Sequence, residues 1–291
     1  MIPLQVIVSI IETGCFFGLL AAAMFVVRES SGFFNFAVGG YAVFAGLASA
    51  YFTSVRGLPA AAGIAIGVIG AVALALLTEV LVVRPMWKPG ANEELPMVIA
   101  LVATLFALEQ ISGVLFGRAA LPGPQLVGDG AVRLGNATVT AQAALEVGLT
   151  ALAFGLLLLF IYRTRMGRGL RAIGENTPAA IVLGLPVRAV RITSFTLAGA
   201  LAGLAGSVFA ARSGIIFESA MDYTLFAFLA LVIGGTASVW GPLAGGLILA
   251  AIQSAAIFYF GAAALHYATL AAAVLFFAFR PQGIFMKRVR V

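Results

Sequence analysis

The sequence predicts an all-α fold: a polytopic integral membrane bundle of about eight to ten spanning helices, in a single domain covering 1–291. The chain is 62% hydrophobic and only 10% charged, whereas average proteins carry about 25% charged residues. A soluble chain of this length cannot bury so much apolar surface, so lipid must be its solvent. Because the apolar residues form long runs and do not alternate with polar ones, the spans are helical and a β-barrel is excluded.

The apolar runs give the expected spans in order. Each is close to the roughly 17–25 residues that a bilayer crossing requires. They occupy 4–27, 36–53, 58–83, 96–117, 144–162, 192–211, 222–239, 241–260 and 264–280. The last three are crowded and rich in glycine, so some of them are expected to be short, tilted or re-entrant. The main polar connections are an external loop at about 118–143 and a cytoplasmic loop at about 163–191.

The basic residues set the expected orientation. With the 163–191 loop in the cytoplasm, 13 of the 17 Lys and Arg residues face inward and four face outward, as the positive-inside tendency requires. The outward four are Arg56, Arg118, Arg133 and Arg212. The C-terminus is then cytoplasmic. The first apolar run has no preceding basic segment, so we expect a span there and not a cleaved signal peptide; nine spans would place the N-terminus outside.

The 163–191 loop itself holds six of the cations between two spans. We expect it to be a docking element on which a cytoplasmic partner pushes. Pro178 suits the first turn of a short helix there, with Thr177 as its cap. Arg171, Arg188 and Arg191 are then placed to meet acidic groups of the partner; the alternative is that they serve membrane topology alone.

Two glycine-rich breaks are candidates for a solute path. In the first, Gly39-Gly40 follow Asn35 and Phe36, so a discontinuous helix that exposes polar backbone and a plain helix start are both consistent with the sequence. The second contains Gly234-Gly235 and precedes Pro242. It carries no charge, which suggests a buried or re-entrant turn.

Three of the carboxylates within the expected spans are considered as candidates for a role inside the bundle. Glu109 lies about 20 Å along its span, where an unpaired charge costs roughly 2.5–3.5 kcal/mol, so it is expected to face the bundle interior unless the span ends earlier and places it in the outer interface. Glu12 is expected to pair inside the bundle or lie in the interface. Glu79 is expected to snorkel with Arg84 toward the cytoplasmic surface.

Other functions are excluded by what the sequence lacks. One histidine, His266, gives no multi-histidine metal site, and one cysteine, Cys15, gives no internal disulfide. The sequence has no phosphate-binding Gly-x-x-x-x-Gly-Lys-Ser/Thr loop and no set of nucleophile, base and orienting group. We therefore expect no enzyme, no metal and no cofactor in this chain, and the net charge of +6 is not read as affinity for nucleic acid.

Several segments in order resemble the permease subunits of bacterial ABC importers for branched-chain amino acids and related solutes. The resemblance covers nearly the whole chain. It is carried by Gly32-Phe-Phe-Asn35-Phe-Ala37, Val83-Arg84-Pro85, Ala103-Thr104-Leu105, Leu115-Phe116-Gly117, Arg168-Gly-Leu-Arg171-Ala-Ile-Gly174-Glu175-Asn176, Ala179-Ala180-x-x-x-Gly184, the glycine-rich 197–206 stretch, Gly234-Gly235-x-x-Ser238-Val-Trp240-Gly241-Pro242 and Arg280-Pro281-Gln282-Gly283-Ile-Phe285. No single piece decides the match, but their order is specific.

The resemblance implies an assembly in the bacterial inner membrane. It comprises this chain, a second homologous permease, two cytoplasmic ABC ATPases that bind ATP and Mg²⁺, and an extracytoplasmic solute-binding protein. It implies coupling to the ATPases through seven residues: Arg171, Glu175, Asn176, Ala179, Ala180, Gly184 and Arg188. It also implies a substrate path along eight residues: Asn35, Phe36, Gly39, Gly40, Thr104, Glu109, Gly234 and Gly235.

One departure from the family pattern concerns the substrate. Many members carry His-Gly, or Gly and an acidic residue, after Asn-Phe-Ala, whereas this chain has Val38-Gly39-Gly40-Tyr41. A permease for urea, an amide or a carboxylate is therefore an alternative to one for branched-chain amino acids. A stand-alone secondary transporter is a further alternative, but it would need its own coupling-ion site.

Overall fold

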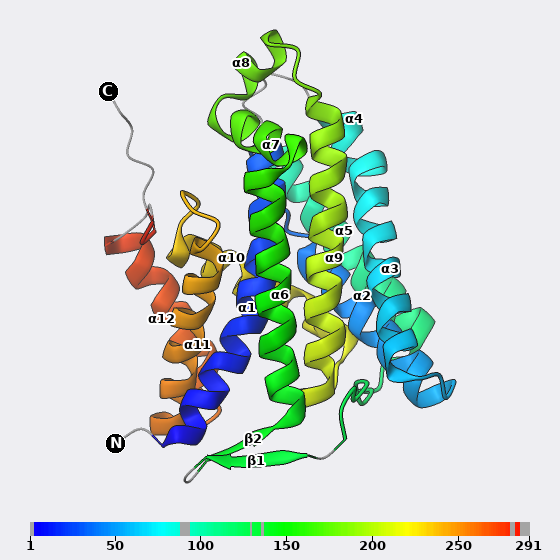
Figure 1. Cartoon of the computed structure of the whole chain (residues 1–291), viewed down its shortest axis with the longest axis vertical. Coiled ribbons are helices and arrows are strands. Elements are labelled where there is room, and N and C mark those ends of the chain that lie inside the picture. Colours follow the sequence, from blue (N-terminus) through cyan, green and yellow to red (C-terminus); the bar gives the residue numbers. More distant parts are fainter. Residues whose placement is uncertain (1–2, 88–93, 129, 135–136, 280–282, 286–291) are drawn as a thin grey trace.

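The helical bundle predicted from the composition is present. The computed structural model describes residues 3–87, 94–128, 130–134, 137–279 and 283–285 (Figure 1). Eight helical segments in this part of the chain are long and apolar enough to cross a membrane. They are built on α1 (Leu4–Ser31), α2 (Val38–Ala50), α3 (Ala60–Thr78), α5 (Glu94–Phe116), α6 (Ala141–Arg163), α9 (Val187–Ser213), α10 (Ala220–Gly234) and α11 (Gly241–Phe260).

A shorter apolar helix follows them. Helix α12 (Ala264–Phe279) has 16 residues and packs beside α11. It runs in the same direction as α1, and Leu4 and Phe279 lie toward opposite ends of the bundle (Figure 1).

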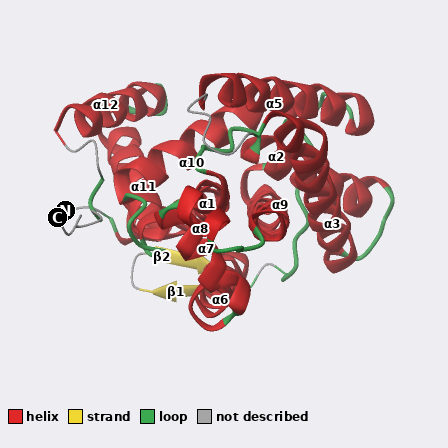
Figure 2. Ribbon diagram, turned by 90° about the horizontal axis from the view of Figure 1, so that it is seen from above, coloured by secondary structure: helices red, strands yellow, loops and turns green. Residues whose placement is uncertain are grey.

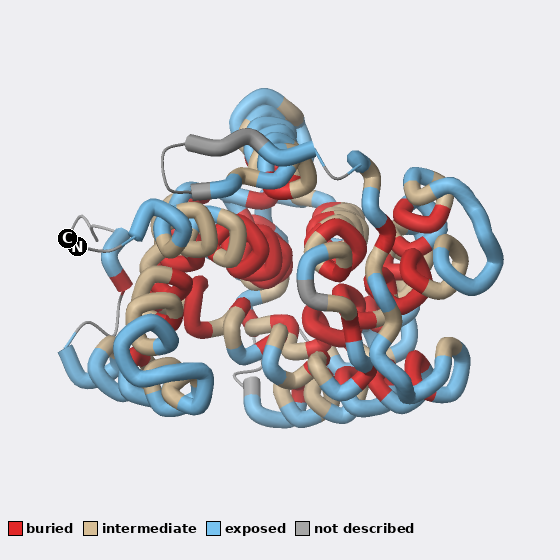
Figure 3. Tube along the Cα trace, turned by 90° about the horizontal axis from the view of Figure 1, so that it is seen from below, coloured by how far each residue is buried: buried red, intermediate tan, exposed pale blue. Residues whose placement is uncertain are grey.

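Small residues let the central helices approach closely. Helices α1 and α9 lie in the middle of the bundle (Figure 3), and α1, α2 and α9 are its most buried helices. On α9, Gly206 touches the backbone of Ala42 in α2, while Gly199 and Gly203 lie against α3. A side chain at any of these glycines would collide with the neighbouring helix, because helices in lipid associate largely through close backbone packing. The glycine spacings therefore serve packing within this chain.

Several spans depart from regular α-helix. Helix α2 continues into the π-helical turn η1 (Tyr51–Val55), and α3 continues through the π-helical turn η2 (Glu79–Val83) into α4 (Arg84–Met86). The 3-10 turn η3 (Phe217–Ser219) precedes α10. Such π-turns insert a residue into the helical ladder and occur often at functional positions.

The external loop is not wholly irregular. It contains an antiparallel hairpin of β1 (Ala131–Leu134) and β2 (Ala137–Thr140), which leads directly into α6. The fold class is all-α as predicted, and this short hairpin outside the spans is an added element that the sequence did not predict. The hairpin was missed because its strands are only four residues long.

The predicted docking loop folds into two helices at the opposite end of the bundle (Figure 1). Helix α7 (Arg165–Glu175) is followed by the short α8 (Thr177–Val182). The predicted cap was wrong by one residue: the Asn176 side chain caps α8 by accepting from the Ala179 N–H at 2.9 Å. Thr177 is already helical, and its hydroxyl donates to the Ile173 carbonyl at 3.0 Å. Asparagine is the better cap because its carbonyl reaches this N–H.

Candidate functional site

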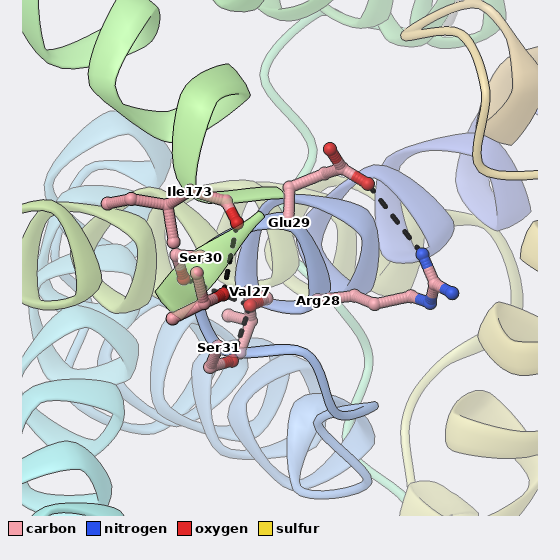
Figure 4. Close-up of polar contacts among 7 residues, drawn as sticks. Val27, Arg28, Glu29, Ser30, Ser31 and Ile173 are labelled. Carbon is pink, nitrogen blue, oxygen red and sulfur yellow. Dashed lines mark hydrogen bonds and ion pairs between the residues drawn. The ribbon is translucent and has the colours of Figure 1, made fainter. Parts of the chain in front are cut away.

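The chain leaves helical geometry between α1 and α2. Gly32 ends α1 with a φ of 86°, and its N–H donates to the Arg28 carbonyl at 2.8 Å. Figure 4 shows this end of α1, with Ile173 of α7 nearby and Arg28 reaching toward Glu29, 3.7 Å away. Residues 33–37 then run without helical structure until α2 starts at Val38. A true break separates the two spans, while Gly39-Gly40 lie inside the second helix.

This break is buried, so its backbone must find partners within the protein. The Asn35 side chain is fully buried and accepts a hydrogen bond from the Ala37 N–H at 3.1 Å. Thr224 of α10 supplies a second cap: its hydroxyl oxygen accepts from the Gly39 N–H at 3.0 Å. The same hydroxyl lies 3.1 Å from the Phe36 carbonyl. It also lies 3.0 Å from the Ala220 carbonyl, and its single proton can be donated to only one of these two carbonyls. A single threonine thus joins the start of α2 to α10.

Helix α5 completes this region. Gly40 lies against Leu108, next to Glu109 in sequence, and Gly39 lies against α10. Helices α2, α5 and α10 gather on one side of α1 and α9 (Figure 2). Glu109 is 8% exposed and lies within electrostatic range of Glu218 and Asp222. Thr104 stands one turn before Leu108, with its hydroxyl donating to the Ala100 carbonyl. The structure therefore brings six of the eight predicted path residues to the α2, α5 and α10 region.

Gly234 and Gly235 are not part of this group. Helix α10 has 15 residues, so Gly234 at its end lies roughly 20 Å from its first residue, Ala220, and Gly235 follows Gly234. Gly235 has a φ of 83°, and the Ile284 and Phe285 N–H groups donate to the Ile233 and Gly234 carbonyls at 3.0 and 3.1 Å. The predicted turn is present but only partly buried: residues 235 and 239 are buried, residues 236–238 are half-buried and Trp240 is exposed. Its contacts hold the 283–285 segment against α10.

A buried ion pair lies beneath the docking element. The Arg191 Nη2 lies 2.9 Å from Glu79 Oε1, and Nε donates to the same oxygen at 3.0 Å. Both side chains are buried, with exposures of 4% and 0%. The Arg191 guanidinium also lies 4.7 Å from the centre of the Trp87 ring. The pair joins the start of α9 to the π-turn η2 that continues α3.

This geometry corrects two expectations. Arg191 does not face a partner, because its guanidinium is buried against Glu79. Glu79 does not snorkel with Arg84, because the π-turn places its carboxylate inside the bundle, opposite α9. In lipid a buried carboxylate requires a nearby cation. Arg84 is the cation nearest to Glu79 in the sequence, but in the fold the partner of Glu79 is Arg191.

Most of the predicted coupling residues lie on the surface of α7 and α8. Arg171, Glu175, Asn176, Ala179, Gly184 and Arg188 are exposed. Ala180 is 2% exposed and packs inward, and its carbonyl accepts from the Leu185 N–H at 3.0 Å. Ala180 is thus placed to join α8 to its own chain and not to contact a partner directly.

Two residues that the sequence analysis did not single out define the outer surface of this element. Val182 is 87% exposed and Leu183 is 79% exposed, directly after the last turn of α8. They lie next to the exposed Ile181, and exposed apolar side chains that gather in one place mark a contact surface. Beneath them, Gly174 of α7 lies against Glu29 of α1. Helix α8 contacts α7, and α7 in turn contacts α1 and α9.

Comparison with known proteins identifies the family of this chain. The sequence matches, over residues 6–279, the family described as branched-chain amino acid transport system, permease component. The chain belongs to this permease family. The permease is 26% identical to the high-affinity branched-chain amino acid transport system permease protein BraD of Pseudomonas aeruginosa, over 97% of this chain and 95% of BraD. It is 28% identical to the corresponding protein LivH of Escherichia coli K12, over 76% of this chain and 74% of LivH.

A shorter match reaches a different transporter. The permease is 34% identical to the ribose import permease protein RbsC of Bacillus subtilis, but over 35% of this chain and 34% of RbsC. The family confirms a multi-pass ABC transporter permease, which is a non-catalytic transport component. It confirms the family resemblance and the expectation that this chain is not an enzyme.

Thr224 provides a direct test of the buried break. Replacing Thr224 by valine removes the hydroxyl with little change of shape, so the Gly39 N–H loses its side-chain acceptor and the Phe36 carbonyl loses the hydroxyl 3.1 Å away. We expect the permease to lose about 1–3 kcal/mol of stability, measured by thermal unfolding in detergent. Thr196→Val is the matched control, because that hydroxyl donates within its own helix to the Ile192 carbonyl. Equal stability of the two variants would contradict the capping role.

Proposed function

We propose that the permease forms half of the substrate path of an ABC importer in a bacterial inner membrane. A second homologous permease forms the other half, two ATPases bind ATP and Mg²⁺ in the cytoplasm, and an extracytoplasmic protein delivers the solute. Helices α7 and α8 and the C-terminal end face the cytoplasm in this arrangement, which the distribution of basic residues supports.

The exposed apolar pair Val182 and Leu183 is the observation that carries the proposal. A short helix that ends in two such side chains, flanked by exposed Arg171 and Arg188, suits burial in a groove of another protein. The Leu185 to Ala180 hydrogen bond and the Arg191–Glu79 pair connect that helix to α9 and α3. An ATPase that moves on binding ATP would therefore move the spans.

The path itself is proposed to run beside the α2, α5 and α10 region. The buried break at Asn35, the Thr224 hydroxyl and Glu109 supply a few polar groups there among mostly apolar surroundings. Such a sparsely polar lining suits a subunit whose partner protein carries much of the selectivity. We place branched-chain amino acids or related small amino acids and amides on this path, which the names of the long-matching relatives support. Urea or a carboxylate is the second candidate, favoured by Val38-Gly39-Gly40-Tyr41.

Uptake into vesicles tests the proposal. The permease, co-expressed with its partner permease, ATPases and binding protein, is expected to import labelled leucine when ATP is supplied, and not without ATP or without the ATPases. Labelled urea and a labelled short carboxylate in parallel identify the substrate class. Uptake by the permease alone, driven by an ion gradient, would show a secondary transporter and overturn the proposal.

A further inference from the structure

A cavity lies beside the docking element, at the end of the bundle where α7 and α8 lie (Figure 1). It has a volume of about 220 Å³ and is bordered by α1, α6 and α7 and by residues of the turn between α10 and α11. A single water needs roughly 10–15 Å³, so the space is large enough for a small organic molecule. None of its described lining residues belongs to α2, α5 or α10, so the cavity is separate from the proposed path.

The inner wall of this cavity is apolar. Phe25 of α1, Ile161 of α6, Leu170 of α7 and Val239 of the turn line it, and all four are buried. Small-molecule sites commonly combine such an apolar wall with a few polar groups that fix the orientation of the ligand. The wall comes from four separate segments of the chain, so a molecule bound there contacts all of them.

Two opposite charges at the opening of the cavity are not paired with each other. Arg171 and Glu175 are exposed, border the cavity and lie one turn apart on α7, a spacing at which such side chains commonly meet. No ion pair joins these two described residues, and the Arg171 guanidinium lies instead 5.1 Å from the centre of the Tyr162 ring. Glu29, the third charged lining residue, already has Arg28 at 3.7 Å (Figure 4). The opening therefore offers one cation and one carboxylate next to an apolar wall.

We propose that this cavity binds a free α-amino acid with an apolar side chain, in its zwitterionic form. Arg171 donates two parallel hydrogen bonds to the α-carboxylate, and Glu175 accepts from the α-ammonium. The aliphatic side chain of the ligand lies against Ile161, Leu170 and Val239, away from water. Urea, or a carboxylate without an amine, satisfies at most one of the two charged groups. The cavity thus selects an amino acid by both of its charges and by its apolar side chain.

Binding in this cavity joins the docking element to the turn that follows α10. Helix α7 contacts α8, α1, α6 and α9, whereas Thr236 and Ala237 on the facing wall belong to that turn. A ligand that touches both walls favours the arrangement in which they are this close and opposes movement away from it. The consequence for transport rests on the proposed function: where the solute is a branched-chain amino acid, the imported product slows further import.

Binding to the unmodified permease is the first test. The full chain in nanodiscs, without ATPases or solute-binding protein, is titrated with labelled leucine. Leucinamide lacks the carboxylate and 4-methylpentanoate lacks the amine, so each should compete at least about tenfold more weakly than leucine, the loss expected for one charged hydrogen bond. Equal competition by either compound, or no binding of leucine at millimolar concentration, would overturn the proposal.

Two matched variants locate the bound leucine. Glu175→Gln keeps the side-chain size of an exposed residue and removes its charge, so leucine should bind at least about tenfold more weakly. Glu109→Gln makes the same change in the proposed path and should keep the affinity of the unmodified protein, because Glu109 lies on α5, away from the cavity. Any result other than loss in the first variant and retention in the second would contradict the assignment.

The complete transporter in vesicles tests the consequence. Unlabelled leucine on the side of the ATPases should lower the initial rate of ATP-driven leucine uptake several-fold, and 4-methylpentanoate at the same concentration should not. In Ala237→Phe, whose larger side chain fills part of the cavity, the ratio of the rates with and without internal leucine should be close to one. A ratio that this variant leaves unchanged would count against the cavity. If no leucine is taken up under any condition, the proposed function for leucine fails, while binding to the permease alone still decides whether the cavity is an amino acid site.

Discussion

Replacing Arg191 by methionine should destabilise the permease by about 3–5 kcal/mol, because the Glu79 carboxylate would remain buried without its cation. Both side chains are almost fully inaccessible, and two N–H groups of Arg191 converge on one oxygen of Glu79. The variant also removes the guanidinium from the Trp87 ring. Thermal unfolding of the purified protein in detergent, with the yield of folded protein in membranes, measures the effect.

The double variant Glu79→Met/Arg191→Met separates charge from packing. With both charges gone, no carboxylate is left alone, and apolar replacements of similar volume can match or exceed the stability of a buried pair. We expect the double variant to recover most of the loss. It should still transport poorly, because the link between α9 and η2 is broken. If the double variant were as unstable as the single variant, the Arg191–Glu79 pair would contribute to stability through its packing and not through its charges.

Replacing Val182 and Leu183 together by aspartate should reduce ATP-driven uptake by about tenfold or more while leaving the permease inserted and folded. Both side chains point away from the bundle, so the change costs little internal packing. At an interface, however, two buried apolar contacts become two desolvated charges, and central contacts of this kind are often worth about 2 kcal/mol or more. Co-purification of the ATPases with the permease, alongside uptake, measures the loss.

Val127→Asp is the matched control for this experiment. Val127 is an exposed valine at the opposite end of the molecule, in the outer connection before the hairpin. It should retain ATPase binding. Full uptake in the Val182→Asp/Leu183→Asp variant would argue against α8 as the docking helix. Variants of Ala180 do not test this point, because Ala180 packs inward and its replacement disturbs the fold of the chain itself.

The helical bundle could be predicted from the sequence because an apolar run long enough to cross a bilayer forms a spanning helix. Each of the eight long segments overlaps a predicted run, and α12 overlaps the ninth. A discontinuous helix near Asn35 was one of the two readings that the sequence left open, and Gly39-Gly40 prove to lie inside α2. The short helix α8 was predicted from the position of Pro178, whereas α7 was not predicted. These features depend on local backbone chemistry, which neighbouring residues in the sequence determine.

Long-range partners were not predictable in this way. Glu79 lies five residues from Arg84 but pairs with Arg191, which is 112 residues away, because a π-turn rotates the carboxylate toward α9. Thr224 lies in an apolar run and carries no motif, yet it caps a segment about 185 residues earlier.

The parallel course of α1 and α12 limits how two copies of this protein can be connected covalently. If α12 crosses the membrane as the other spans are proposed to, a short flexible peptide from the Phe279 end of one copy to the Leu4 end of the next would have to traverse the lipid. A single-chain tandem dimer would therefore need an inserted hydrophobic helix of about 20 residues as its connector. A permease half with an even number of passes could be joined by a hydrophilic linker alone.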